Sequence, residues 1–213
     1  MHREIAPGVR QMDLDKSWHN YDFFDNDKLR IMPTAYWQEV GYQTTRTMLH
    51  FKAQYFLPTT EAISELQKLI APIGPEDCLE IGAGNGWLGS LLGIKMTDSH
   101  RQSKAAIMAA YLASGQPIIV YGQDVEKLDA LSAVRKYKPH TVIGSWVSEK
   151  SSILPDGIDE EHLLRMVKRY ILIGSDTIHG KKIIMARKHQ KIKSPFLLSR
   201  TEKQQENSIW IWE

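Results

Sequence analysis

The hydrophobic pattern changes character near Asp77. Before that point, residues 33–55 carry a weak helical spacing of apolar side chains, and residues 59–74 carry a stronger one that begins at a threonine cap and ends at proline and glycine. After it, short apolar runs alternate with stretches of helical pattern. The pattern therefore predicts an irregular N-terminal arm (residues 1–32) and a helical extension, which together make up residues 1–58, followed by a main domain over residues 59–213.

The main domain is predicted to be an α/β structure. Strands are expected at residues 78–82, 94–97, 117–121, 140–147 and 170–175, with helices at 101–115, 124–139 and 159–170 between them. Such alternation predicts a doubly wound, mostly parallel sheet covered on both faces. Two final apolar runs, 181–187 and 208–213, have no helical pattern between them, so we expect them to form an antiparallel C-terminal pair of strands.

A glycine-rich turn follows the first predicted strand in the stretch CLEIGAGNGWLGSLLG. Gly82, Gly84 and Gly86 lie between a strand and a helix, at the edge of a parallel sheet where ligands bind. The dinucleotide-binding pattern G-x-G-x-x-G would place its third glycine at Trp87, and no phosphate-loop lysine is present. Glu80, two residues before the turn, disfavours a pyrophosphate and suits a cation such as a sulfonium.

The segment EIGAGNG resembles motif I of the class I S-adenosylmethionine-dependent methyltransferases, (D/E)-x-G-x-G-x-G. The resemblance extends over residues 59–213 as an order of strands. It implies a Rossmann-like fold of the class I methyltransferase type, with S-adenosylmethionine as cofactor. The cofactor-binding residues that it implies are Glu80, Gly82, Gly84, Gly86, Asp98 and Asp124.

Each of the two aspartates has its own implied role. Asp98 ends the second predicted strand, where the family places an acid that binds the ribose hydroxyls. Asp124 follows the third predicted strand, where an acid lies near the adenine amino group; it could instead cap the next helix. Only about a dozen residues separate Gly86 from Asp98, so the helix between them must be short.

The acceptor side is predicted from residues after the fourth and fifth strands. In the resembled family the end of the fourth strand faces the acceptor, which here assigns Ser145 and Trp146 to an acceptor pocket. The proline-containing signature of enzymes that methylate base amino groups is absent. Candidate general bases are His100, Glu149 and His179, although a loop histidine is more often a surface residue.

The N-terminal part has two interpretations. Elements before the first strand often act as a lid in the resembled family, which would make Trp18, Tyr21 and Tyr55 candidates for covering the site. The alternative is ordinary packing of an extension onto the sheet.

Composition narrows the class of protein. With 42% hydrophobic and 24% charged residues the chain is expected to fold, and its apolar runs are too short for a membrane span of about 20 residues. The N-terminus shows no secretory pattern, which predicts a cytoplasmic location. A single cysteine excludes an internal disulfide, and no paired ligand spacing indicates a metal.

Charge bears mainly on the partner. The net charge is +2, but the stretch 181–203 holds eight basic residues and one acid. It is either a solvated edge or an anion-facing surface, so a nucleic acid partner stays open without being favoured.

Three functional hypotheses follow. The first is methyl transfer from S-adenosylmethionine to an unidentified acceptor, with a small molecule favoured. The second is a methyltransferase-like binding or scaffold module without catalysis. The third is an NAD-dependent oxidoreductase, against which Glu80 and Trp87 argue.

Overall fold

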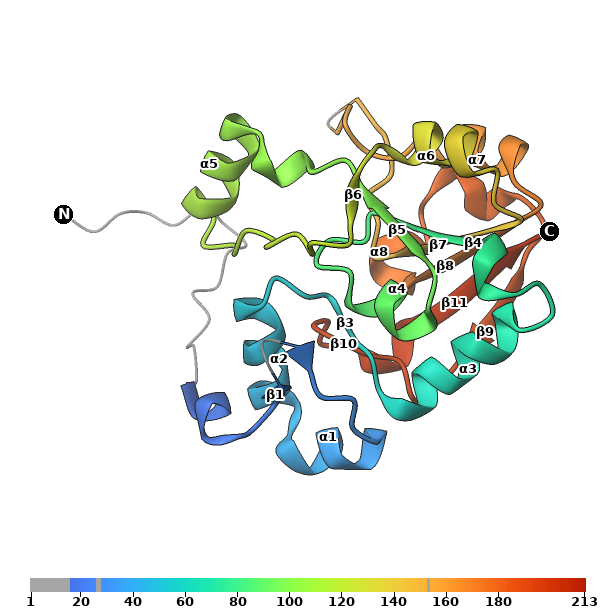
Figure 1. Ribbon diagram of the computed structural model, residues 1–213. Coiled ribbons are helices and arrows are strands. Elements are labelled where there is room, and N and C mark those ends of the chain that lie inside the picture. Colours follow the sequence, from blue (N-terminus) through green and yellow to red (C-terminus); the bar gives the residue numbers. More distant parts are fainter. Residues whose placement is uncertain (1–15, 26–27, 153) are drawn as a thin grey trace.

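The computed structural model describes residues 16–25, 28–152 and 154–213, and its centre is a seven-stranded sheet with helices on both faces (Figure 1). The strand order is β6-β5-β4-β7-β8-β11-β9. The bounds of these strands are β4 (Cys78–Ile81), β5 (Lys95–Asp98), β6 (Glu126–Lys127), β7 (Thr141–Ser145), β8 (Arg169–Ser175), β9 (Gln190–Lys193) and β11 (Asn207–Trp212).

The directions of the strands confirm the predicted fold class. From β6 to β8 all neighbours pair in parallel, whereas β11 runs antiparallel to both β8 and β9. The chain order reverses at β4, where it passes first to β5 and β6 on one side and then to β7 on the other. This is a doubly wound, Rossmann-like sheet with antiparallel C-terminal strands.

Alternation of side chains along the strands separates two apolar cores. Cys78 faces one side with α3 (Thr60–Ile70) and α4 (Trp87–Leu92), and Leu79 faces the other with α6 (Ala130–Tyr137) and α7 (Glu160–Met166). Both strand residues are almost fully buried. The central strands are therefore apolar on both faces, as expected for a parallel sheet between helical layers.

The N-terminal extension has its own apolar cluster and joins the domain by strand pairing. It comprises η1 (Lys16–Asn20), β1 (Phe24–Asp25), β2 (Lys28–Leu29), α1 (Thr34–Val40), α2 (Tyr42–Phe51) and β3 (Phe56–Leu57). Strand β3 pairs antiparallel with β10 (Leu198–Ser199). The single helix expected over residues 33–55 is divided in two, because Gly41 has φ 90° and ψ 149° and leaves the helical region. Residues 1–15 of the predicted arm lie outside the described residues.

Two predictions between β5 and β7 are wrong. Residues 117–121 form no strand of the sheet; the third strand is β6, which follows later and is short. The next helix begins at Ala130 with Asp129 as its cap, not at Asp124. The apolar run is instead part of an insertion that contains α5 (Ala105–Ala113) and then crosses the glycine turn, where the Gly122 N–H donates to the Gly84 carbonyl at 3.3 Å. A short apolar run does not reveal which surface will cover it.

A further prediction fails near the C-terminus. Residues 181–187 are predicted as a strand, but they contain the 3-10 turn η4 (Ile183–Ala186), which follows α8 (Asp176–His179). The strand that pairs with β11 at this edge is β9. Ile184 and Lys182 are buried, whereas Ile183 is 58% exposed. The 3-10 turn η5 (Gln204–Glu206) precedes β11, and η2 (Pro75–Asp77) and η3 (Arg101–Ser103) complete the described elements.

The buried turn is held by an ion pair inside the domain. Lys182 pairs with Glu160 of α7, and its Nζ also donates to the Val147 carbonyl at 3.1 Å. The Tyr170 hydroxyl donates to the other Glu160 oxygen at 2.7 Å. Burial raises the pKa of Glu160 and lowers the pKa of Lys182, because desolvation penalises each charge. Each partner therefore requires the other.

Removing Lys182 alone should destabilise the fold more than removing the charges of both Lys182 and Glu160. We expect Lys182→Met to lower the free energy of unfolding by about 3–5 kcal/mol, since Glu160 would be left buried without its cation. The double variant Lys182→Met/Glu160→Gln should recover most of that loss, because glutamine can still accept from Tyr170. Urea denaturation of the two variants measures this, and equal destabilisation of both would contradict the explanation.

Candidate functional site

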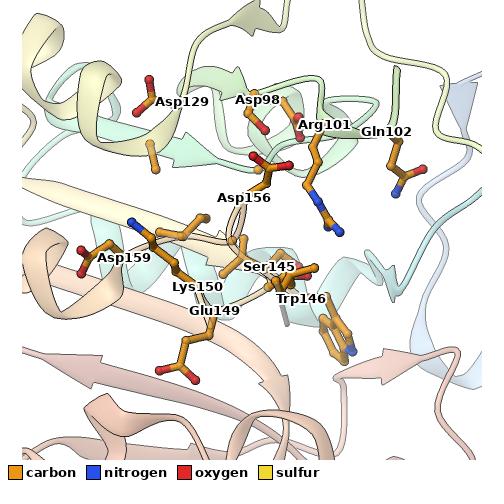
Figure 2. A pocket seen from close by; sticks show the side chains of 18 of the residues that line it. Asp98, Arg101, Gln102, Asp129, Ser145, Trp146, Glu149, Lys150, Asp156 and Asp159 are labelled. Atoms are coloured by element: carbon orange, nitrogen blue, oxygen red, sulfur yellow. The ribbon is translucent and has the colours of Figure 1, made fainter. Parts of the chain in front are cut away.

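A cavity of about 790 Å³ opens at the carboxyl edge of the sheet (Figure 2). Residues that follow five different strands line it: Gly82 after β4, Asp98 at the end of β5, Asp129 after β6, Ser145 and Trp146 at the end of β7, and His179 after β8. Parallel strands bring these positions together because all of them end at the same edge. One cavity thus contains residues that were predicted separately for the cofactor and the acceptor.

The glycine turn is fastened to the neighbouring strand by Asp98. Its two carboxylate oxygens accept from the backbone N–H of Gly84 at 3.0 Å and of His100 at 2.7 Å. Gly84 has φ +58°, a conformation that side chains disfavour. Asp98 is buried and lines the cavity, and each of its oxygens keeps a second lone pair for a ligand hydroxyl.

Glu80 has a different environment from the one that the sequence suggested. Its carboxyl group is buried and accepts from the backbone N–H of Gly89, in the first turn of α4, at 2.8 Å. A Cβ at Gly89 would lie 2.6 Å from the Glu80 Oε2 atom, so only glycine permits this approach. Burial raises the pKa of Glu80 to about 8. At neutral pH the group is therefore mainly protonated, and a cation bound nearby would be needed to ionise it.

The two predicted aspartates differ in position. Asp98 reaches the cavity as expected. The positional basis for Asp124 is wrong, because Asp124 precedes β6 in an exposed turn, whereas Asp129 follows β6 and lines the cavity. Asp129 also caps α6 by accepting from the Ser132 N–H at 3.0 Å. The sequence signal for Asp129 was its position just before an amphipathic helix. It was missed because the third strand was assigned to residues 117–121.

The acceptor-side residues come together at the end of β7. Trp146 has φ +54°, and its ring stacks on Phe56 at a centroid distance of 5.9 Å. Glu149 follows in the next loop and accepts from the Ile183 N–H at 3.0 Å through one oxygen. Ser145, Trp146 and Glu149 all line the cavity (Figure 2).

The two candidate histidines are placed differently. His179 lines the cavity, and its Nδ1 accepts from the Ser175 N–H at 3.0 Å, so in the neutral ring the proton is on Nε2. Burial, aided by the Lys182 charge, lowers the pKa of His179 to about 4. His179 is thus a neutral hydrogen-bond donor at neutral pH. His100 does not line the cavity; its ring stacks on Tyr121 at 3.9 Å.

Two segments from outside the sheet cover the glycine turn. Tyr55, just before β3, and Ile119 of the insertion line both the main cavity and a smaller one of about 60 Å³ beside Glu80 and Gly84. Of the suggested lid residues, Tyr55 thus reaches the site, whereas Trp18 and Tyr21 line neither cavity.

The basic stretch 181–203 is dispersed and largely neutralised. Lys182 is buried with Glu160, Lys191 and Lys193 share Asp176, and the other pairs are Arg187 with Glu161 and Lys203 with Glu206. Arg200 lies over the Tyr55 ring at 4.2 Å. These contacts favour the solvated-edge interpretation over an anion-facing surface.

Within the described residues there is neither a metal-binding cluster nor a membrane-spanning helix. No group of three or more His, Cys, Asp or Glu side chains in residues 16–25, 28–152 and 154–213 is arranged to hold a metal ion. None of the helices in those ranges has the length and apolar character that crossing a membrane requires.

Comparisons with known proteins identify no family for this chain. No protein-family model matches, and no curated protein matches. Among solved structures, a precorrin-6y C5,15-methyltransferase from Geobacter metallireducens is 12% identical, with a TM-score of 0.42, over 74% of this chain and 90% of that chain. A ribosomal protein L11 methylase from Lactobacillus delbrueckii is 17% identical, with a TM-score of 0.35, over 72% of this chain and 78% of that chain.

A third similar structure is an S-adenosylmethionine-dependent O-methyltransferase from Thermotoga maritima. It is 10% identical, with a TM-score of 0.38, over 80% of this chain and 69% of that chain.

The raised pKa of Glu80 predicts a pH dependence of stability. The unfolded carboxyl group ionises near 4.5 and the folded one near 8, so the folded state holds an extra proton between these values. The free energy of unfolding should fall as pH rises through this window, with a slope that approaches about 1.4 kcal/mol per pH unit.

Glu80→Gln should remove that slope, because an amide stays neutral and can still accept from Gly89. Denaturant unfolding of both proteins at several pH values between 6.5 and 8 measures it, because the titration of unfolded His179 near pH 6.5 contributes equally to both proteins and cancels in their difference. Parallel pH profiles for the variant and the wild-type protein would contradict a proton held on Glu80.

Proposed function

We propose that this protein transfers a methyl group from S-adenosylmethionine to an acceptor bound in the same cavity. The observation that carries the proposal is the convergence of Gly82, Asp98 and Asp129 at the ends of three adjacent strands. In this proposal the motif EIGAGNG and the two acids serve the cofactor as the corresponding strand ends do in the resembled family. The order of the sheet, with β11 as its antiparallel strand, agrees with that assignment.

The residues of this site fit S-adenosylmethionine. Asp98 offers carboxylate lone pairs to the ribose hydroxyls, and Asp129 offers an acceptor to the adenine amino group. The glycine turn allows close approach of the backbone, and Glu80 beneath it would favour a cationic ligand by ionising. When bound, the cofactor would supply an electrophilic methyl group on a sulfonium. A dinucleotide fits less well, because Trp87 stands where the dinucleotide-binding pattern has its third glycine, which permits close packing of helix on strand.

The acceptor-side residues suggest a division of labour. Glu149 has one oxygen held by the Ile183 N–H, which leaves the other able to take a proton from an acceptor hydroxyl or amine as its lone pair attacks the methyl group. His179 carries its proton on Nε2 and would donate a hydrogen bond to the acceptor. These roles make Glu149 the proposed base and His179 a positioning residue. A small-molecule acceptor is favoured, because ion pairs neutralise much of the basic stretch.

The test is calorimetric titration of the purified protein with S-adenosylhomocysteine, with NADH as control. We expect micromolar binding of the first ligand alone, followed by transfer of labelled methyl from S-adenosylmethionine in an acceptor screen. Binding of NADH alone would overturn the proposal in favour of an oxidoreductase. Cofactor binding without transfer to any acceptor would favour a non-catalytic module.

Matched serine variants test the reassignment of the third acid. Asp129→Ser keeps a residue that can cap α6 but is too short to reach a ligand, so we expect affinity for S-adenosylhomocysteine to fall about 10-fold or more. Asp124→Ser should leave that affinity unchanged, because Asp124 lies in an exposed turn outside the cavity. The same titration measures both variants, and a larger loss for Asp124→Ser would restore the original assignment.

A further inference from the structure

The cavity is larger than its cofactor-facing residues require, and its second half has a distinct chemistry. Figure 2 shows Asp98 and Asp129 together at one side, and Trp146 and Glu149 at the other. The cavity volume of about 790 Å³ leaves room beside a nucleoside-sized cofactor for a small ring system. The side chains of that second half therefore indicate the chemical class of the acceptor.

Aromatic side chains from three separate segments line the cavity. Trp146 comes from the end of β7, Tyr55 precedes β3, and Tyr111 of α5 and Tyr121 both belong to the insertion. The Trp146 ring is fixed between Phe56, on which it stacks, and His179, whose ring is perpendicular to it at 89°. Flat, immobilised aromatic walls favour a planar ligand, because ring stacking adds to the gain from apolar burial.

Arg101 supplies a cation between these walls. Figure 2 shows its guanidinium reaching from η3 into the cavity on the side of Trp146. Among the described residues no ion pair involves Arg101, and its Nε is buried without a hydrogen-bond partner. Burial raises the pKa of the Tyr111 hydroxyl, and the nearby Arg101 charge opposes that effect.

Two lysines that line the cavity have counter-charges, whereas Lys150 and Lys181, which also line it, are exposed. Lys104 pairs with Asp156 at 2.9 Å, and Lys182 pairs with Glu160. A half-buried guanidinium that keeps its fork of donors is a receptor for a carboxylate or phosphate, which it can bind through two parallel hydrogen bonds. The aromatic walls and Arg101 together thus describe a ligand with a ring and an anionic group.

We propose that the acceptor is a planar aromatic molecule bearing a carboxylate or phosphate, its ring against Trp146 and its anionic group on Arg101. This inference rests on the proposed function, since it assigns the half of the cavity that the cofactor leaves free. It places the group to be methylated toward Glu149, away from the anionic substituent.

The experiment titrates aromatic probes into protein saturated with S-adenosylhomocysteine. One arm compares 4-hydroxybenzoate with its primary amide and with cyclohexanecarboxylate, and a second compares guanosine 5′-monophosphate with guanosine. We expect the aromatic anion of one arm to bind at least about 10-fold more tightly than its uncharged counterpart. The arm that responds identifies the anion as a carboxylate or a nucleotide phosphate.

Variants connect the preference to the proposed residues. Arg101→Gln should abolish the preference for the anion and leave the affinity for S-adenosylhomocysteine within about 2-fold of wild type. The matched control Arg165→Gln, on the exposed face of α7, should retain the preference. Trp146→Leu should weaken binding of the aromatic probe and leave binding of S-adenosylhomocysteine unchanged.

Two results would overturn this inference alone. One is binding of S-adenosylhomocysteine with no preference for any aromatic anion, and the other is a loss of S-adenosylhomocysteine affinity in Arg101→Gln equal to the loss for the probe, which would assign Arg101 to the cofactor. Failure of S-adenosylhomocysteine to bind the wild-type protein would instead refute the proposed function together with the inference.

Discussion

The carboxylate of Asp98 joins the two strands on which the rest of the site depends. By accepting from Gly84 and His100 at once, it fixes the glycine turn after β4 against the end of β5. The glycine turn determines where α4 begins, and the Gly89 N–H of α4 donates to Glu80. The insertion contacts the same turn through the hydrogen bond from the Gly122 N–H to the Gly84 carbonyl. A buried charge that accepts two backbone donors is stable without a cation, which leaves Asp98 available to a ligand as well.

The two halves of the cavity are built in different ways. The cofactor-facing half is made by strand ends of one sheet, so its geometry follows from the ladder of hydrogen bonds. The acceptor-facing half depends on side chains that cross between elements: Lys182 holds the Val147 carbonyl beside Trp146, and Glu160 neutralises Lys182. Under the proposed function, specificity for an acceptor would therefore depend on a buried ion pair, whereas binding of the cofactor would depend on the sheet.

The outcome for individual residues shows what pattern reading could reach. The glycine turn and Asp98 were predictable because each follows a strand with a strong apolar signal, and the antiparallel end of the sheet was predictable from SIWIWE. Asp129 was missed because residues 117–121 resemble a strand more closely than β6 does. Residues 181–187 failed for the same reason: apolar content shows that a segment is buried, but not against which partner.

The sequence by itself determined the layered α/β fold, the position of the glycine turn and Asp98 at its edge. These follow from local periodicity and from residue types that only certain backbone conformations accept. Only the tertiary structure decided that Asp129 and not Asp124 reaches the cavity, that Glu80 is buried under α4, and that His179 carries its proton on Nε2. Each of those features depends on contacts between segments that are far apart in the chain. Burial and hydrogen bonding in the folded protein determine these contacts, whereas the local sequence pattern does not.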